Sequence, residues 1–285
     1  MIGDEVAALL DTKVAGVTAL ATGAGGVGTY RVALLDGGNV FAKAAGPDGL
    51  PAPGFLDSEA HGLRWLREAD PTAVPEVLGS GETLLVTAWI APGRPTEQGA
   101  EEFGRRLATV HARGAQAYGA EWPGFIGPLP LDNHEEEDWG RFYAARRVLP
   151  FLRAAVDRGA VDRDGAAAIE QVCERISTLA GPPELPARIH GDLWTGNVHW
   201  DTRGRAWLID PAAHGGHRET DLAMMAVFEL PFLDTILAAY DEVHPLADGW
   251  RERISLHQLH PLLVHAVLFG PSYGAQAAAA ARQYL

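Results

Sequence analysis

The stretch Ile189–Asn197, IHGDLWTGN, places a histidine, an aspartate and an asparagine in one short segment. Asp192 follows His190 by two residues, and Asn197 follows Asp192 by five. A β-type run, VHW, begins directly after the segment, and a turn leads to a second run, AWLI, which Asp210 follows. If these two runs pair as a hairpin, Asn197 and Asp210 come side by side at its open end. We therefore expect two oxygen-bearing side chains to converge near Asp192.

These residue types at these intervals suit phosphoryl transfer. Loops that catalyse such transfer to a hydroxyl place an aspartate two residues after a histidine and an asparagine five residues after that aspartate. In this chemistry Asp192 accepts the hydroxyl proton. Asn197 and Asp210 offer oxygens to Mg²⁺, which prefers few protein oxygens together with phosphate and water. The alternative is an Asx-rich turn with a structural histidine and an ordinary strand-end aspartate, which leaves the convergence unexplained.

A glycine-rich segment near the start, GAGGVG, fits the pattern G-x-G-x-x-G with Gly23, Gly25 and Gly28. Glycines let backbone amides approach a phosphate without side-chain obstruction. The strand-type run TYRVALL follows, so the context is strand, loop, strand, as in loops that cover a nucleotide phosphate. A dinucleotide-binding oxidoreductase would need a helix there. A plain glycine-rich hairpin fits the segment equally well.

Lys43 lies in the strand-type run NVFAKAA, and Glu59 lies sixteen residues further on, at the start of a helical stretch. Glu59, Leu63 and Leu66 stand at i, i+4 and i+7, so the carboxylate shares the apolar face, whereas Glu68 falls roughly opposite. A carboxylate on a buried face needs a cationic partner, and Lys43 is the candidate. Such a pair orders the α- and β-phosphates of ATP. The alternative is a lysine whose stem packs along the sheet and a glutamate favoured by the helix dipole.

The periodicity divides the chain into two parts. The first ninety or so residues alternate short β-type runs with glycine-rich turns, interrupted by one helical stretch whose cap we expect at Asp57 or Ser58. From Gln98 onward helical patterns dominate. We therefore predict an α+β fold with a small antiparallel sheet and one packing helix in residues 1–91. Residues 92–285 should form a helix-rich part that contains the catalytic hairpin.

Composition limits the partners. The 285 residues carry a formal net charge of −14, from 37 acidic and 23 basic side chains, which opposes nucleic-acid binding. No run of about 18 apolar residues could span a bilayer, and no basic stretch precedes an apolar one at the beginning. We expect a cytoplasmic protein with neither a nucleic-acid nor a membrane partner. The single cysteine, Cys173, has no second thiol to pair with, so we interpret it as structural.

Several segments resemble the signatures of fructosamine (ketosamine) kinases, a small-molecule branch of the protein-kinase-like and aminoglycoside phosphotransferase superfamily. They span about Gly23 to Met225 and include HGDLWTGN, IDPA, GHRETDLAM, FIGPLP and DWGRFYAARRVLP. The D-F-G and A-P-E elements of protein kinases are missing from IDPAAHGGHRETDLAMM. The tryptophan of LWTGN and the GHRE run are the specific parts. The remaining pattern also fits aminoglycoside or choline kinases.

The resemblance implies a protein-kinase-like two-lobed fold with ATP between the lobes. It implies transfer of the γ-phosphate to the 3-hydroxyl of a ketosamine, either a free metabolite or a glycated protein lysine. The implied residues are the base Asp192, the Mg²⁺ ligands Asn197 and Asp210, the phosphate-ordering pair Lys43 and Glu59, and the adenine-contacting backbone from Ala88 to Ile90.

On the acceptor side, the resemblance implies that Trp194 offers an aromatic surface to the sugar or to the amine substituent. It also implies that His217, Arg218 and Glu219 line the acceptor site, although packing at a helix terminus is an alternative role for His217 and Arg218. The remaining two residues, His190 and Asp221, would be structural supports of the catalytic loop.

The chain departs from the family pattern in two places. Family members usually carry paired tyrosines before GHRE, where this chain has His214 and Gly215, and a TPQPN-like segment, where it has Leu129–Asn133. These departures bear on the choice of acceptor, whereas the phosphate-transfer residues are all present. An aminoglycoside- or choline-type phosphotransferase and a non-catalytic ATP-binding pseudokinase scaffold are the rival functions. The sequence predicts no oligomeric state.

Overall fold

The computed structural model of the chain describes residues 1–22, 26–46, 52–227 and 230–285. Of the predicted glycine loop, Gly23 and Gly25 lie outside the described residues, whereas Gly28 begins a strand. Five antiparallel strands form one sheet in the order β1-β2-β3-β5-β4. They are β1 (Val14–Thr22), β2 (Gly28–Leu34), β3 (Asn39–Ala44), β4 (Val77–Gly81) and β5 (Leu84–Ala88).

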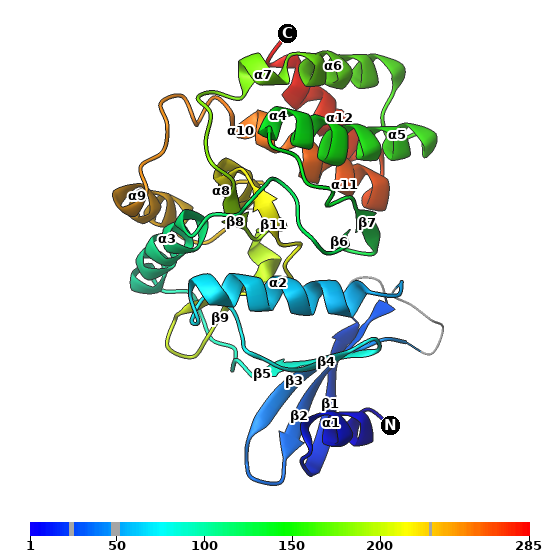
Figure 1. The fold of residues 1–285 in the computed structure, drawn as a ribbon, viewed down its shortest axis with the longest axis vertical. Helices are drawn as coiled ribbons and strands as arrows, with labels where there is room; N and C mark the ends of the chain where they lie inside the picture. Colours follow the sequence, from blue (N-terminus) through cyan, green and yellow to red (C-terminus); the bar gives the residue numbers. More distant parts are fainter. Residues whose placement is uncertain (23–25, 47–51, 228–229) are drawn as a thin grey trace.

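Two helices pack against this sheet, α1 (Ile2–Leu10) and α2 (Phe55–Ala69). Figure 1 places α2 between the sheet and the helical part of the molecule. The buried face of α2 carries Leu56, Glu59, Leu63 and Leu66, as the periodicity predicts. The expected cap at Asp57 or Ser58 was wrong. The helix begins at Phe55 because Gly54, with φ of 84°, supplies the left-handed turn, and no side chain caps the helix.

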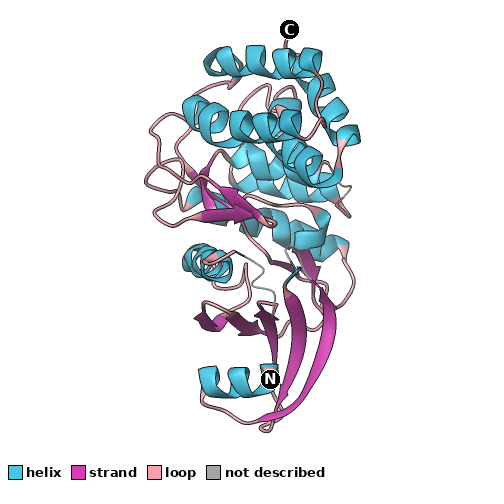
Figure 2. Cartoon of the chain, turned by 90° about the vertical axis from the view of Figure 1, so that its right-hand side faces the viewer, coloured by secondary structure: helices cyan, strands magenta, loops and turns pink. Residues whose placement is uncertain are grey.

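The remainder is mainly helical. Its helices are α3 (Glu97–Ala112), α4 (Trp139–Phe142), the π-helix η2 (Tyr143–Val148), α5 (Leu149–Asp157), α6 (Arg163–Glu174), α7 (Ile176–Leu179), α8 (Arg218–Met225), α9 (Leu233–Val243), α10 (Ile254–His257), α11 (Leu259–Phe269) and α12 (Pro271–Arg282). A large apolar core lies among α5, α6, α11 and α12. Most helices of this second part gather at one end of the molecule, and the five-stranded sheet, with α1 beside it, lies at the other (Figure 2).

Three short antiparallel pairs lie in this second part. They are β6 (Gly124–Ile126) with β7 (Leu129–Leu131), β8 (Ala187–Ile189) with β11 (His214–Gly216), and β9 (Val198–Trp200) with β10 (Ala206–Leu208). The β9–β10 pair is the hairpin expected from VHW and AWLI, and a single 3₁₀ turn, η3 (Thr195–Asn197), precedes it. The antiparallel sheet and these pairs confirm the predicted fold class.

Close backbone contacts join the two parts directly after β5. The amide of Gly93 donates to the carbonyl of Trp200 at 2.7 Å. A Cβ at Gly93 would lie 2.0 Å from the Asp201 carbonyl oxygen, so only glycine fits this crossing. The lobe boundary at residues 91 and 92 stays a prediction. Among the helices in the described residues, none combines the length and apolar character needed to cross a bilayer.

Candidate active site

A cavity of about 280 Å³ lies where α2 and β3 face the loop before β9. It gathers six of the site residues predicted from the sequence. Its described lining is Val27, Lys43, Phe55, Ser58, Glu59, Phe125, Gly127, Asp192, Trp194, Gly196, Asn197, Asp210, Pro211 and Ala212. Residues more than 150 positions apart in the chain therefore meet at one polar site, and Lys43 and Asp210 are bonded across it.

The predicted ion pair between Lys43 and Glu59 is present. Nζ of Lys43 donates to Oε1 and Oε2 of Glu59 at 2.8 and 2.9 Å, and to Oδ1 of Asp210 at 2.7 Å. Burial alone would lower the pKa of Lys43, but the charges of Glu59 and Asp210 outweigh it and raise that pKa, so the ammonium stays protonated. Burial raises the pKa of Glu59, and the Lys43 charge opposes that rise. The buried ammonium is thus held between two carboxylates.

Asn197 and Asp210 meet at the open end of the hairpin, as its geometry predicts. The amide of Ile209 donates to the carbonyl of Asn197 at 3.0 Å. Nδ2 of Asn197 donates to the main-chain oxygen of Asp192 at 2.8 Å and to its Oδ2 at 2.9 Å, which leaves Oδ1 of Asn197 as an acceptor. Asp210 has φ of 54°, a left-handed conformation found at functional sites, and its side chain is 42% exposed. Two oxygen donors therefore stand beside Asp192.

The environment of Asp192 suits a proton acceptor. Burial raises the pKa of Asp192 to about 7; the hydrogen bond from Asn197 opposes that rise, and the charges of Asp210 and Asp221 add to it. A carboxyl group with a pKa near neutrality can take up and release a proton under ordinary conditions. The nearest hydrogen-bond donor, Nδ2 of Asn197, also fixes the orientation of the carboxylate.

Two buried groups brace the loop that carries Asp192. Asp221 accepts the amide of His190 at 2.7 Å and the amide of Gly191 at 2.9 Å. The ring of His190 contacts the carbonyl of Ile209 through Nε2 at 2.8 Å, and its Nδ1 accepts the amide of Asp192 at 3.2 Å. The ring thus ties the segment before Asp192 to the strand end before Asp210. These contacts have the form expected of structural supports.

A second cavity of about 270 Å³ adjoins the first, and both are lined by Glu59 and Asp210. Its other walls are mostly apolar, from β3, α2 and the end of β5. They comprise Leu20, Phe41, Leu63, Pro75, Thr87, Ala88, Trp89, Ile90, Pro92, His199 and Ile209. The backbone predicted to meet adenine, Ala88 to Ile90, lies along this wall. A flat apolar base could bind in this second cavity while the phosphates attached to it lie in the adjoining polar cavity.

Three aromatic side chains line the polar cavity beside Asp192. They are the predicted Trp194 and two that the sequence interpretation missed, Phe55 and Phe125. The Phe rings meet edge to face, with centroids 5.6 Å apart. A signal for Phe55 was available, because it precedes Glu59 by four residues and so shares its helix face. Phe125 lies in the short pair β6–β7, whose position no local pattern reveals.

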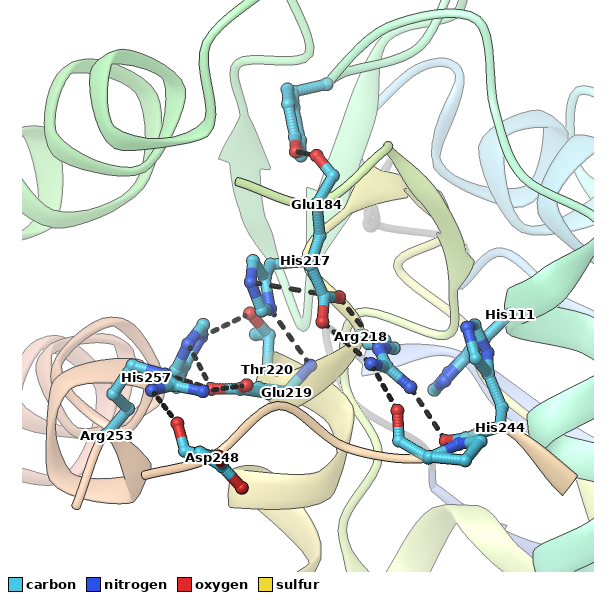
Figure 3. Close-up of polar contacts among 12 residues, drawn as sticks. His111, Glu184, His217, Arg218, Glu219, Thr220, His244, Asp248, Arg253 and His257 are labelled. Carbon is cyan, nitrogen blue, oxygen red and sulfur yellow. Dashed lines mark hydrogen bonds and ion pairs between the residues drawn. The ribbon is translucent and has the colours of Figure 1, made fainter. Parts of the chain in front are cut away.

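The GHRE run lies elsewhere, outside both cavities. Figure 3 shows Arg218 paired with Glu184 and directed at the carbonyl of His244. Its guanidinium donates to both Glu184 oxygens at 2.7 Å and to the carbonyls of His244 and Pro245 at 2.8 Å. His217 caps α8, because its Nδ1 accepts the amide of Glu219. The structure does not bring these residues to Asp192; it supports the alternative of packing at a helix terminus.

Glu219 is also buried, and its carboxylate is bonded to other side chains of the protein. Its carboxylate accepts two bonds from Arg253, at 2.9 and 2.6 Å, and lies 3.3 Å from Nε2 of His257 (Figure 3). His217, Glu219 and His257 are close enough to ligate one cation. However, the guanidinium already engages both carboxylate oxygens, and Nδ1 of His217 accepts the Glu219 amide, so its ring proton belongs on the other nitrogen. The cluster is therefore an internal polar network.

Comparison with known proteins identifies the family. The fructosamine kinase family profile matches residues 12–285. The chain belongs to the fructosamine kinase family. A probable ketoamine kinase of Thermus thermophilus is 37% identical over 223 residues, which cover 78% of this chain and 80% of the relative. The crystal structure of a Thermobifida fusca protein assigned as a fructosamine-3-kinase superposes with a TM-score of 0.95 at 48% identity, covering 99% of this chain and 97% of that one.

More distant kinases share only the fold with this family member. A choline kinase of Streptococcus pneumoniae superposes with a TM-score of 0.62 at 15% identity, over 99% of this chain and 96% of the other. The protein-kinase-like fold is thereby confirmed. The dinucleotide-binding alternative was wrong, because the strands flanking the glycine segment, β1 and β2, pair antiparallel in a sheet without the parallel strand–helix–strand unit that it requires.

Proposed function

We propose that this chain transfers the γ-phosphate of ATP to a sugar hydroxyl of a ketosamine. One observation carries the proposal: in a member of the fructosamine kinase family, Lys43, Asp192, Asn197 and Asp210 line one cavity that adjoins an apolar cavity. A base, a fixed ammonium and two oxygen donors are what phosphoryl transfer to a hydroxyl requires. A pseudokinase scaffold usually lacks one of these groups.

Each residue of the site has a separate role in this proposal. Asp192 orients the acceptor hydroxyl and takes its proton, with Oδ2 held by Asn197. Lys43, fixed by Glu59, presents its ammonium to the phosphates. The backbone of Ala88 to Ile90 and the apolar wall bind adenine. Gly23, Gly25 and Gly28 are proposed to approach the phosphates, on the sequence pattern alone.

Mg²⁺ fits the donors that the site offers. Asn197 Oδ1 and the part-exposed carboxylate of Asp210 are hard oxygen donors, few in number and beside the proposed phosphate site. These two residues would hold the ion, which neutralises phosphate charge when bound.

The aromatic side chains favour an acceptor with a substituted amine. In an N-substituted ketosamine the nitrogen is a secondary amine, protonated near neutral pH. Four covalent bonds separate it from the 3-hydroxyl oxygen, so the two atoms lie at most about 5 Å apart. Trp194, Phe55 and Phe125 line the cavity that holds Asp192. Ring faces attract an alkylammonium and cover its apolar substituent. We propose that the sugar lies at Asp192 and the amine substituent lies along these rings.

This acceptor chemistry covers both a free sugar-amine and a glycated lysine of a protein, since the four methylenes of lysine provide such a substituent. The proposal includes a cytoplasmic location, where ATP is available. The acceptor test uses purified chain, ATP and Mg²⁺ with unsubstituted fructosamine, ribulosamine, choline and an aminoglycoside. We expect phosphate on a ketosamine hydroxyl, located by mass spectrometry and NMR. Turnover confined to choline or the aminoglycoside would contradict the proposal.

A further inference from the structure

We propose that His111, Tyr240 and Arg218 form a buried positioning chain that acts on the catalytic loop through Asp221. None of the three lines either cavity. This series of hydrogen-bonded side chains extends from the surface loop that carries Glu184 to the backbone amides directly before Asp192. The inference rests on the proposed function, because it assumes that Asp192 is the base.

The inner end of the chain is Asp221, which is fully buried. Its Oδ1 accepts the amide of Gly191, and its Oδ2 accepts both the amide of His190 and Nε2 of His111, the latter at 3.2 Å. Burial alone would raise the pKa of Asp221, but the hydrogen bond from His111 and the amide of His190 hold that pKa below its ordinary value. The carboxylate that fixes two loop amides therefore depends on a donor from α3.

The middle of the chain joins α3 to α9. Nδ1 of His111 lies 2.9 Å from the hydroxyl of Tyr240, and their rings meet edge to face with centroids 5.5 Å apart. His111 is 1% exposed and Tyr240 is 0% exposed, so water is not an alternative partner. His111 has a carboxylate, Asp221, beside one ring nitrogen and a hydroxyl, Tyr240, beside the other. Only one tautomer of the neutral ring can hydrogen-bond to both partners.

Asp221 supplies the direction of this hydrogen-bond network. Its carboxylate can only accept, so the proton of the neutral His111 ring resides on Nε2 and points to Asp221. Nδ1 of His111 is then an acceptor, and the hydroxyl proton of Tyr240 points to it. Arg218, fixed by Glu184, is the cation that faces the Tyr240 hydroxyl, and this interaction contributes to the raised pKa of Arg218.

This arrangement gives the GHRE run a role in catalysis without substrate contact. Bonds within one buried network reinforce each other, and removing a single donor leaves its partners unsatisfied. Loss of the Tyr240 hydroxyl frees the tautomer of His111 and weakens the donor to Asp221. The amides before Asp192 are then held less firmly, and a base misplaced by a fraction of an ångström transfers its proton more slowly.

Tyr240→Phe tests the chain by removing one hydroxyl group. We expect kcat to fall about three- to tenfold, the size of one buried hydrogen bond, with KM for ATP and for the ketosamine unchanged. The matched control is Tyr143→Phe. Tyr143 is also buried, and its hydroxyl donates to the carbonyls of Leu256 and His257, remote from the cavities. Tyr143→Phe should lower the melting temperature as much and leave kcat unchanged.

Combining Tyr240→Phe with Asp192→Asn separates two effects of the lost hydroxyl. One is a misplaced Asp192, and the other is a general loss of rigidity in the protein. If the hydroxyl acts only by placing the base, the residual single-turnover rate of Asp192→Asn should not fall further. His111→Gln, which keeps a donor toward Asp221, should retain more activity than His111→Leu.

The proposal is overturned if kcat of Tyr240→Phe equals that of wild type or of Tyr143→Phe, or if the loss repeats in full in the Asp192→Asn background. Failure of the proposed function itself has a different signature, because Asp192→Asn alone would then turn over at the wild-type rate.

Discussion

The HGDLWTGN loop, proposed to be catalytic, and the GHRE run are both polar motifs of the helical part, yet their surroundings differ. Asp192, Trp194 and Asn197 face a cavity of about 280 Å³. His217, Arg218 and Glu219 are each at most 5% exposed, and their polar groups are bonded within the protein. A motif rich in charged residues thus need not contact substrate. What distinguishes the two is whether the hydrogen-bonding groups are already satisfied inside the protein.

The largest effect among the following three substitutions is expected from Lys43→Arg, which changes a residue that lines the cavity. Arginine keeps the charge but places a planar fork where a compact ammonium lies between Glu59 and Asp210. We expect phosphoryl transfer to fall by about 10²-fold, comparable to the loss of one preorganised donor. Steady-state kinetics beside a melting curve check this. Wild-type turnover with an unchanged melting curve would show that Lys43 is merely a strand lysine.

A smaller effect is expected from Phe125→Leu. Losing a ring contact worth about 1.4 kcal/mol raises KM about tenfold. The rise should appear for N-butyl fructosamine, whose butyl group stands in for a lysine side chain, and not for unsubstituted fructosamine. Phe269→Leu is the control, since Phe269 is 66% exposed and lies outside both cavities. Equal KM changes for both acceptors would exclude the substituent subsite.

The smallest effect on transfer is expected from Glu219→Gln. The change leaves Arg253 buried without its carboxylate partner, which we expect to cost about 3 kcal/mol of folding stability. Well below the melting temperature, KM for the acceptor should stay at its wild-type value. Denaturant unfolding and acceptor kinetics on the same sample check both halves. A selective rise in KM for the acceptor would contradict this account and support the prediction that Glu219 lines the acceptor site.

Local patterns predicted the parts of the site that adjacent residues define. Helix-face counting placed Glu59 inward, and the two apolar runs around the turn brought Asn197 to Asp210. The strand β4 carries little local signal, because VLGSG has two glycines and no clear alternation. The helix α1 was missed, and it packs against the far end of the sheet.

The buried network was beyond local patterns for a physical reason. His111 and Asp221 are 110 residues apart and meet only because α3 and α8 both pack against β8. Helix-face counting places His111 inward, on the face of Phe103 and Leu107, but no local pattern identifies its partners. The environment of Arg218 likewise depends on Glu184, in a proline-rich loop, and on carbonyls after α9. Such partners come from tertiary packing, which one sequence does not reveal.

The central claim, that HGDLWTGN is the catalytic loop, is tested most directly by Asp192→Asn. The change keeps the size and most hydrogen bonding of the side chain but removes the proton acceptor. We predict that single-turnover transfer to a ketosamine falls by about 10²–10⁴-fold, while calorimetric affinity for ATP with Mg²⁺ stays within about twofold of wild type. Transfer at the wild-type rate, with phosphate confirmed on the sugar, would contradict the account.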